Sequence, residues 1–175
     1  MRIDLSELLS VADKELDVQA DIEMQRFVSR MCDYEIIDKK PLFISLRNTG
    51  KKAFSLETNI VLSVLIPCGR CLEDVKYDMN ITINKDIDMN ESENDKAQIL
   101  EYQTYIQDNC LDVEKMVYNE ILVHLPMKVL CSENCKGICN RCGANLNSQT
   151  CNCDTTELDP RMSKIRDIFN NFKEV

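Results

Sequence analysis

The stretch "FSLETNIVLSVLIPCGRCLEDVKYDMNITI", from Phe54 to Ile83, decides the fold. On either side of its "PCGRCLED" segment, apolar side chains occupy every second position and polar side chains occupy most of the others. A period of two is typical of a strand with one buried face. The two halves therefore predict a β-hairpin whose tip carries Cys68 and Cys71.

Further elements are predicted on both sides of this hairpin. Upstream, "PLFISLRNTGKKAFSLE" (41–57) predicts another strand with a turn at 48–50, and "LDVQADIEM" and "YEIID" are weaker strand candidates. Downstream, "NCLDVEKMVYNEILVHLP" has apolar residues at helical spacing and ends at Pro126. "LDPRMSKIRDIFNNF" predicts a last helix, with Pro160 at its first position.

These elements predict the α+β class: an antiparallel β meander with a central helix, a cysteine-rich zinc-binding loop and a C-terminal helix. We expect two units. Residues 1–126 form an α+β domain with the meander, the CGRC hairpin and the central helix. Residues 127–175 form the cysteine-rich zinc loop, with the C-terminal helix packed on it.

Composition narrows the function. The chain has 175 residues, and a hydrophobic content of 44% is enough for a core. Its net charge of −9 repels nucleic acids and anionic membranes as a whole, so any RNA contact needs a local basic patch. The longest apolar run, "IVLSVLIP", is too short to span a bilayer. We therefore expect a cytoplasmic protein without membrane contact, whose clustered thiols stay reduced.

Five cysteines lie in "CKGICNRCGANLNSQTCNC", from Cys135 to Cys153. Within it, "CNRCG" is typical of a zinc knuckle, because two thiolates grip one ion and the glycine lets backbone N–H groups turn toward the sulfurs. The only histidine, His124, lies outside the cluster, so an all-cysteine site for one Zn²⁺ is predicted. Its predicted ligands are Cys135, Cys139, Cys142 and Cys153, with Cys131 and Cys151 as alternates.

The pair Cys68 and Cys71 has three interpretations. It could form half of a second zinc site, because eight cysteines would make two four-cysteine sites. It could be a redox dithiol, although such a thiol is usually activated at a helix N-terminus and the flanking pattern here is β. It could also be a hairpin tip with adjacent thiols and an outward Arg70.

A basic stretch holds five bases and no acid, namely Lys39, Lys40, Arg47, Lys51 and Lys52. It is either a solvated strand edge or a face that contacts phosphates. Catalysis has little support, because the sequence has one histidine and neither a nucleophile motif nor a phosphate-cradling glycine loop. We therefore expect no enzyme and no small-molecule substrate.

The assembled motifs resemble the YceD family of large ribosomal RNA subunit accumulation proteins. The matching pieces are "CGRCLEDV" (Cys68–Val75), "VYNEILVHLPMKVLC" (Val117–Cys131), "CKGICNRCGANLN" (Cys135–Asn147), "CNC" (Cys151–Cys153) and "DPRMSKI" (Asp159–Ile165). Their order and spacing agree across roughly residues 60–170.

The resemblance implies a non-enzymatic factor for the synthesis, processing or stability of 23S rRNA. Its partner would be large-subunit rRNA or a ribosomal or RNA-processing protein. The resemblance also implies that zinc is an accessory stabilising ion and not the shared mechanism, and that Arg70 and Arg161 share a functional or structural role. An arginine side chain suits either contact with a phosphate or a bidentate bond to a carboxylate, so both residues are candidates for nucleic-acid or partner binding. Two other functions stay open: a thiol–disulfide oxidoreductase that uses Cys68 and Cys71, and a zinc-stabilised protein-interaction module.

Overall fold

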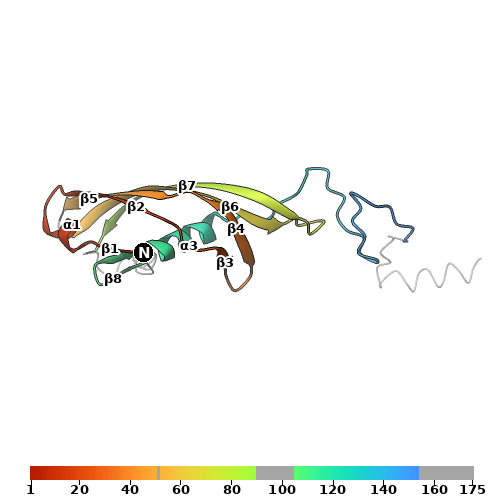
Figure 1. The fold of residues 1–175 in the computed structure, drawn as a ribbon, viewed down its shortest axis with the longest axis horizontal. Coiled ribbons are helices and arrows are strands. Elements are labelled where there is room, and N and C mark those ends of the chain that lie inside the picture. Colours follow the sequence, from red (N-terminus) through yellow and green to blue (C-terminus); the bar gives the residue numbers. More distant parts are fainter. Residues whose placement is uncertain (51, 90–104, 154–175) are drawn as a thin grey trace, which may run out of the picture.

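The computed structural model describes residues 1–50, 52–89 and 105–153 of the chain. Most of this part is antiparallel β-structure, arranged as a six-stranded sheet and a three-stranded sheet (Figure 1). The larger sheet contains β2 (Glu15–Ala20), β3 (Arg26–Val28), β4 (Asp33–Lys39), β5 (Leu42–Gly50), β6 (Ala53–Pro67) and β7 (Asp74–Asp88). The smaller sheet contains β1 (Arg2–Asp4), β8 (Ile106–Gln107) and β9 (Cys110–Asp112). Two helices, α1 (Ser6–Ser10) and α3 (Val113–His124), accompany them.

The predicted hairpin is confirmed, and its first strand, β6, is the central strand of the larger sheet, paired with β4, β5 and β7. β6 and β7 pair without interruption from Ala53↔Asp88 to Pro67↔Asp74. The opposite edge of β6 is shared, because β5 pairs with its first part and β4 with its later part. The strand order is therefore not a simple meander. β6 has 15 residues, so two shorter strands fit along one of its edges.

The alternating apolar residues that predicted the hairpin are the residues that the structure buries in its core. On β6, the side chains of Phe54, Leu56, Ile60, Leu62 and Val64 are all buried. On β7, those of Met79, Ile81, Ile83 and Ile87 are buried too. Strand side chains alternate between the two faces, so these residues cover one face of the sheet with apolar surface. Burial of this surface is the main stabilising term of the fold.

The main helix of the described part is α3, which the sequence predicted at nearly these bounds. The Asp112 side chain caps its first turn by accepting a hydrogen bond from the Lys115 backbone N–H at 3.3 Å. Its buried residues include Met116, Val117 and Ile121, which face the core.

The prediction of a central helix is wrong. α3 lies along one face of the sheet, and its Leu122 and Val123 are 49% and 75% exposed (Figure 1). A helix in the middle of a fold would be buried on all sides. Neither α1 nor α3 is long and apolar enough to cross a membrane, and the structure describes no longer helix.

Residues 127–153, the cysteine tail, follow α3 and extend past the tip of the β6–β7 hairpin (Figure 1). The tail contains no helix or strand, only an isolated bridge between Ile138 and Asn145. The predicted C-terminal helix lies outside the described residues, as do Lys51 and Arg161.

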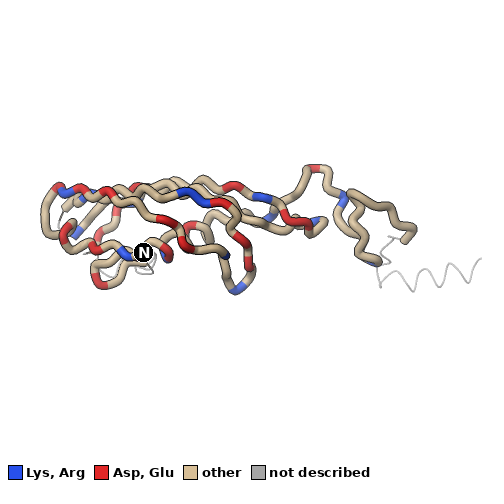
Figure 2. Tube along the Cα trace, in the orientation of Figure 1, with Lys and Arg blue, Asp and Glu red and all other residues tan. Residues whose placement is uncertain are grey.

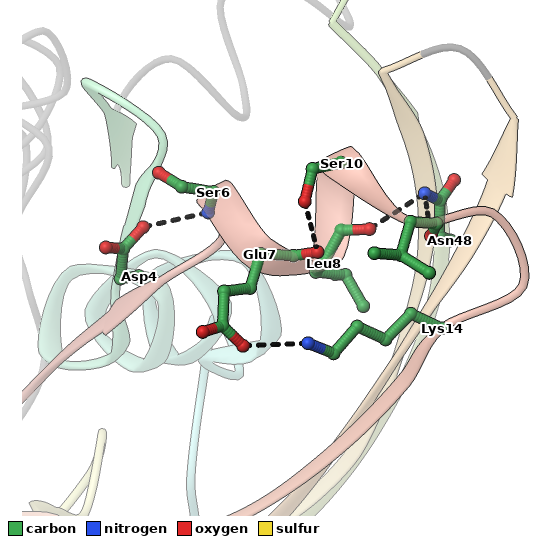
Figure 3. A network of polar contacts seen from close by, with 8 residues as sticks. Asp4, Ser6, Glu7, Leu8, Ser10, Lys14 and Asn48 are labelled. Carbon is green, nitrogen blue, oxygen red and sulfur yellow. Dashed lines mark hydrogen bonds and ion pairs between the residues drawn. The ribbon is translucent and has the colours of Figure 1, made fainter.

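A buried amide ties the N-terminal segment to the larger sheet. The Asn48 side chain is 3% exposed, and its Nδ2 donates to the carbonyls of Leu8 at 2.8 Å and Val11 at 2.7 Å (Figure 3). Its Oδ1 accepts a hydrogen bond from the Gly50 backbone N–H at 2.9 Å. One side chain therefore closes the β5–β6 turn and fixes the end of α1. Nearby, Lys14 forms an exposed ion pair with Glu7 (Figure 3).

Replacing Asn48 should destabilise the protein through these carbonyls. We expect Asn48→Ala to lower the free energy of unfolding by about 1–3 kcal/mol, because two carbonyl groups lose their donor. Asn48→Asp should cost more, because carboxylate oxygens would then face those carbonyls. Denaturant unfolding followed by circular dichroism measures both variants. Asn59→Ala, on the exposed face of β6, should change stability by no more than about 0.5 kcal/mol. Equal stabilities of Asn48→Ala and Asn59→Ala would contradict this role.

Candidate metal centre

The tip of the β6–β7 hairpin presents two buried thiols. Cys68 is 0% exposed and Cys71 is 5% exposed. The tip is closed by backbone hydrogen bonds, from Cys68 N to Glu73 O at 2.8 Å and from Leu72 N to Cys68 O at 3.0 Å. Leu72 adopts a left-handed conformation with φ of 62°. This tight turn places the two sulfurs on the same side of the tip.

The cysteine tail supplies two more thiols to this tip. The Cys68 Sγ lies 3.8 Å from the Cys135 Sγ, and the Cys71 Sγ lies 3.5 Å from the Cys131 Sγ. All four sulfurs lie within 4.8 Å of one another. We call Cys68, Cys71, Cys131 and Cys135 the hairpin cluster.

A second group lies entirely within the tail. The sulfurs of Cys139, Cys142, Cys151 and Cys153 also lie within 4.8 Å of one another, and we call these residues the tail cluster. Gly143 follows the first pair with φ of 75°, a conformation that favours glycine. Its N–H donates to the Cys139 carbonyl at 2.9 Å, and the Cys139 N–H donates to Ala144 O at 2.8 Å. This geometry is that of the predicted knuckle.

The structure divides the cysteines differently from the predicted ligand set. Cys139, Cys142 and Cys153 lie together, but their fourth neighbour is the alternate Cys151. Cys135 and the alternate Cys131 lie with Cys68 and Cys71 instead. Between Cys135 and Cys139, Gly137 has φ of 79°, and a Cβ there would meet the Arg70 carbonyl oxygen at 3.0 Å. The chain bends against the hairpin tip at this glycine, so the cysteines on its two sides enter different clusters.

Each cluster contains a thiol that favours the thiolate form. Hydrogen bonds from the backbone N–H groups of Cys71 and Arg70 lower the pKa of Cys68 to about 6, although burial opposes this. In the tail cluster, the N–H groups of Cys142 and Arg141 lower the pKa of Cys139 to about 6. Such donors stabilise negative charge on sulfur, which is the form that binds metals.

In each cluster, burial and neighbouring thiols raise the pKa of another cysteine. The Glu73 N–H lowers the pKa of Cys71, but burial and hydrogen bonds with neighbouring thiols outweigh it and raise this pKa to about 12. In the tail cluster, the hydrogen bond with Cys142 and burial raise the pKa of Cys153 to about 12. The thiols within each cluster thus differ in how readily they lose their protons, and a divalent cation would displace the protons that remain.

The donor sets fit zinc. Four sulfurs held tetrahedrally at about 2.3 Å from Zn²⁺ lie about 3.8 Å from one another. Two sulfur separations in the hairpin cluster, 3.5 and 3.8 Å, are close to this value. All ten cysteines are free thiols, and a disulfide would require about 2.05 Å. Both clusters could thus hold metal ions, and their all-sulfur donor sets are consistent with zinc. His124 belongs to neither cluster.

Arg70 contacts the tail instead of pointing outward. Its Nη1 donates to the carbonyls of Cys135 at 2.8 Å and Glu133 at 3.3 Å. The Arg70 carbonyl accepts a hydrogen bond from Ile138 N at 3.1 Å, and Gly69 N donates to Val129 O at 2.8 Å. The hairpin tip therefore holds the tail through both backbone and side chain. The sequence suggested phosphate or carboxylate partners for this guanidinium, and the described contacts are carbonyls.

The described members of the predicted basic set, Lys39, Lys40, Arg47, Lys52 and Arg70, lie at separate places along the larger sheet. Lys39 donates to Met24 O at 3.0 Å, and Arg47 forms an ion pair with Glu15 at 3.4 Å. Lys40 and Lys52 are exposed, but they lie beside opposite ends of β5, about 25 Å apart at the rise of a strand. Arg70 lies past the far end of β6 from Lys52. Figure 2 shows acidic residues interleaved with the basic ones along these strands.

Known proteins resemble this chain over the same region. A chloroplastic "Large ribosomal RNA subunit accumulation protein YCED homolog 1" from Arabidopsis thaliana is 35% identical over 49 residues, which are 28% of this chain and 15% of that protein. An uncharacterized protein from Mycobacterium bovis is 24% identical over 58% of this chain and 49% of its own length. YlbN from Bacillus subtilis is 27% identical over 70% of each chain. This chain thus spans half or less of the first two relatives, and no solved structure matches it.

The family described as "Large ribosomal RNA subunit accumulation protein YceD" matches residues 56–169 of the 175. This match includes β6 from its fourth residue onward, the CGRC tip, α3 and all eight cysteines of the two clusters. The chain belongs to the YceD family.

Proposed function

We propose that this protein is a non-enzymatic cytoplasmic factor that supports biogenesis of the large ribosomal subunit, through the synthesis, processing or stability of 23S rRNA. The family match over residues 56–169 carries the proposal. Two relatives, from Arabidopsis thaliana and Zea mays, are named for accumulation of the large ribosomal RNA subunit. The matched residues include the hairpin tip and the cysteine tail, so the match extends over both cysteine clusters.

The arrangement of the thiols favours a binding protein over a redox enzyme. A thiol–disulfide oxidoreductase has one observation in its favour, the lowered pKa of Cys68. Such an enzyme must expose its attacking sulfur to a substrate disulfide, and Cys68 is 0% exposed. Two further thiols also lie within 4.8 Å of the pair, as metal ligands do. The lowered pKa therefore serves metal binding better than exchange.

We also propose that the tail cluster binds one zinc ion and that this ion holds the cysteine tail in its fold. The tail has a single isolated bridge and no helix or strand among its described residues. A segment with so little regular structure gains its order from the metal that it binds. The ion would be held by Cys139, Cys142, Cys151 and Cys153.

Loss of the protein should lower the amount of large-subunit rRNA. In cells depleted of it, we expect the ratio of 23S to 16S rRNA to fall and large subunits to become scarce on sucrose gradients. The full-length protein should restore both, and so should Cys32→Ser, whose sulfur lies outside the two clusters. An unchanged ratio after verified depletion would contradict the proposed function.

Removing one ligand of the tail cluster should remove its zinc. Cys142→Ser should lower the zinc content by one ion per chain, measured by elemental analysis, and make the tail sensitive to protease. The sheet should keep its unfolding transition, because its core lies on β6, β7 and α3 and includes no tail-cluster residue. Cys110→Ser, outside both clusters, should keep its zinc. Iron in place of zinc, or an unchanged zinc content in Cys142→Ser, would refute this assignment.

Direct contact with rRNA should depend on the exposed lysines. Each phosphate contact contributes about −0.7 to the slope of log affinity against log salt for single strands. We expect Lys40→Ala and Lys52→Ala each to reduce the slope by about this amount if each contacts one phosphate. Binding to a large-subunit RNA fragment at several salt concentrations measures it. Arg47→Ala, whose guanidinium is paired with Glu15, is the matched control.

The same experiment identifies the class of partner. Salt-dependent binding that weakens in the lysine variants supports RNA. The purified protein could instead show no salt-dependent RNA binding, while a ribosomal or RNA-processing protein still co-purifies with it from nuclease-treated extracts. In that case the partner is that protein.

A further inference from the structure

The hairpin cluster joins two distant parts of the chain. Cys68 and Cys71 belong to the tip of the larger sheet, and Cys131 and Cys135 belong to the cysteine tail. The sulfurs of Cys68 and Cys135, 67 positions apart, lie 3.8 Å from each other. Backbone hydrogen bonds also join the two parts, but none of them requires four thiols to converge. An interaction between the sulfurs themselves would account for that convergence.

We propose that the hairpin cluster is a second zinc site, and that its ion fastens the cysteine tail to the hairpin tip. This inference goes beyond the proposed function, which assigns one ion to the tail cluster. The two sites would differ in role. The ion of the tail cluster organises one local segment, whereas the ion of the hairpin cluster sets the position of that segment on the sheet.

The burial of the hairpin cluster fits a structural metal. Cys68, Cys71 and Cys135 are 0%, 5% and 3% exposed. Structural zinc sites are closed, with all four positions of the tetrahedron taken by protein ligands. Among the described residues, the partly buried apolar side chains that pack on these three are Val75 and Leu130. Two such side chains would contribute little to the stability of the contact between tail and tip. Hydrophobic burial alone therefore does not account for four converging thiols.

The surroundings suit the charge that such a site would carry. Four thiolates around Zn²⁺ leave a net negative charge on the sulfurs, which nearby donors stabilise. The Cys131 N–H points to the Cys68 Sγ at 3.4 Å, and Asn147 Nδ2 points to the Cys135 Sγ at 3.3 Å. The Arg70 guanidinium adds a positive charge next to the site through its hydrogen bond to the Cys135 carbonyl. In known metal sites, hydrogen-bond donors of this kind orient the ligands and stabilise their charge.

Close backbone contact at two glycines lets the tail reach the tip. At Gly69, a Cβ would meet the Lys128 side chain at 3.1 Å, and at Gly137 it would meet the Arg70 carbonyl oxygen at 3.0 Å. Both glycines therefore lie where the tail and the tip touch. Beyond the cluster, a few hydrogen bonds cross this contact, among them Gly69 N to Val129 O and Asn145 Nδ2 to Glu73 Oε1, each at 2.8 Å. Without the ion, these bonds would have to hold the tail alone.

The test counts zinc ions on the full-length chain. Native mass spectrometry of reduced protein titrated with zinc should show two bound ions. Cys135→Ser should lose one, Cys142→Ser should lose the other, and the double variant should lose both. Cys32→Ser, outside both clusters, should keep two.

A second measurement follows the docking of the tail. In hydrogen exchange, the Gly69 and Ile138 amides, which bond across the contact, should lose protection in Cys135→Ser but keep it in Cys142→Ser. The Cys68 amide, which bonds within the tip to Glu73, should stay protected in both and shows that the hairpin is folded.

One ion on the wild-type chain would overturn the proposal, and so would two ions on Cys135→Ser. Disulfides found by alkylation of the native protein under non-reducing conditions would also overturn it. The wild-type titration needs no variant, so a poorly folded mutant cannot obscure the result. None of these measurements involves RNA, so they stand even if the ribosomal role fails.

Discussion

The uninterrupted ladder between β6 and β7 is the constraint on which the rest of the structure depends. Every residue of β6, from Ala53 to Pro67, has a partner on β7. A slip of one residue would turn the apolar face of a strand toward solvent, so burial of that face fixes the register. The register then fixes the positions of the strands that pair with the hairpin and of the turn at its tip. It offers β4 and β5 one long edge, and it sets the CGRC turn at the end of the sheet, where the cysteine tail meets it.

Sequence patterns predicted the helices and strands that are long enough for their apolar residues to recur at a regular spacing. The β6–β7 hairpin and α3 were found because apolar residues recur along each at the spacing of its structure. β1, β8 and β9 were missed, because strands of two or three residues are too short to show a period and exist through their pairing. The positions of β4 and β5 along β6 depend on which edge of β6 is left unpaired by β7, and that is a property of the assembled sheet. The place of α3 on one face of the sheet likewise depends on tertiary packing.

For the cysteines too, the features set by neighbouring residues could be predicted, and those set by tertiary contacts could not. The knuckle at Cys139 and Cys142 could be recognised from its spacing and from Gly143. The partition of the other six could not, because it depends on the bend at Gly137 and on how the tip receives it. The one sequence signal was that eight of the ten cysteines lie in motifs, enough for two sets of four. The role of Arg70 was similarly hidden, since its carbonyl partners are formed by a segment more than sixty positions away.

The shared construction of the hairpin cluster has an evolutionary consequence. Half of its sulfurs come from the tip and half from the tail, and neither half can complete a four-coordinate site alone. Selection on Cys68 and Cys71 is therefore tied to the presence of Cys131 and Cys135. A lineage that lost the tail would leave the thiols of Cys68 and Cys71 without the other two ligands, and selection would no longer retain them. Cys68 and Cys71 should accordingly be gained and lost together with Cys131 and Cys135 among relatives, whereas the tail cluster is free to vary as a unit of its own.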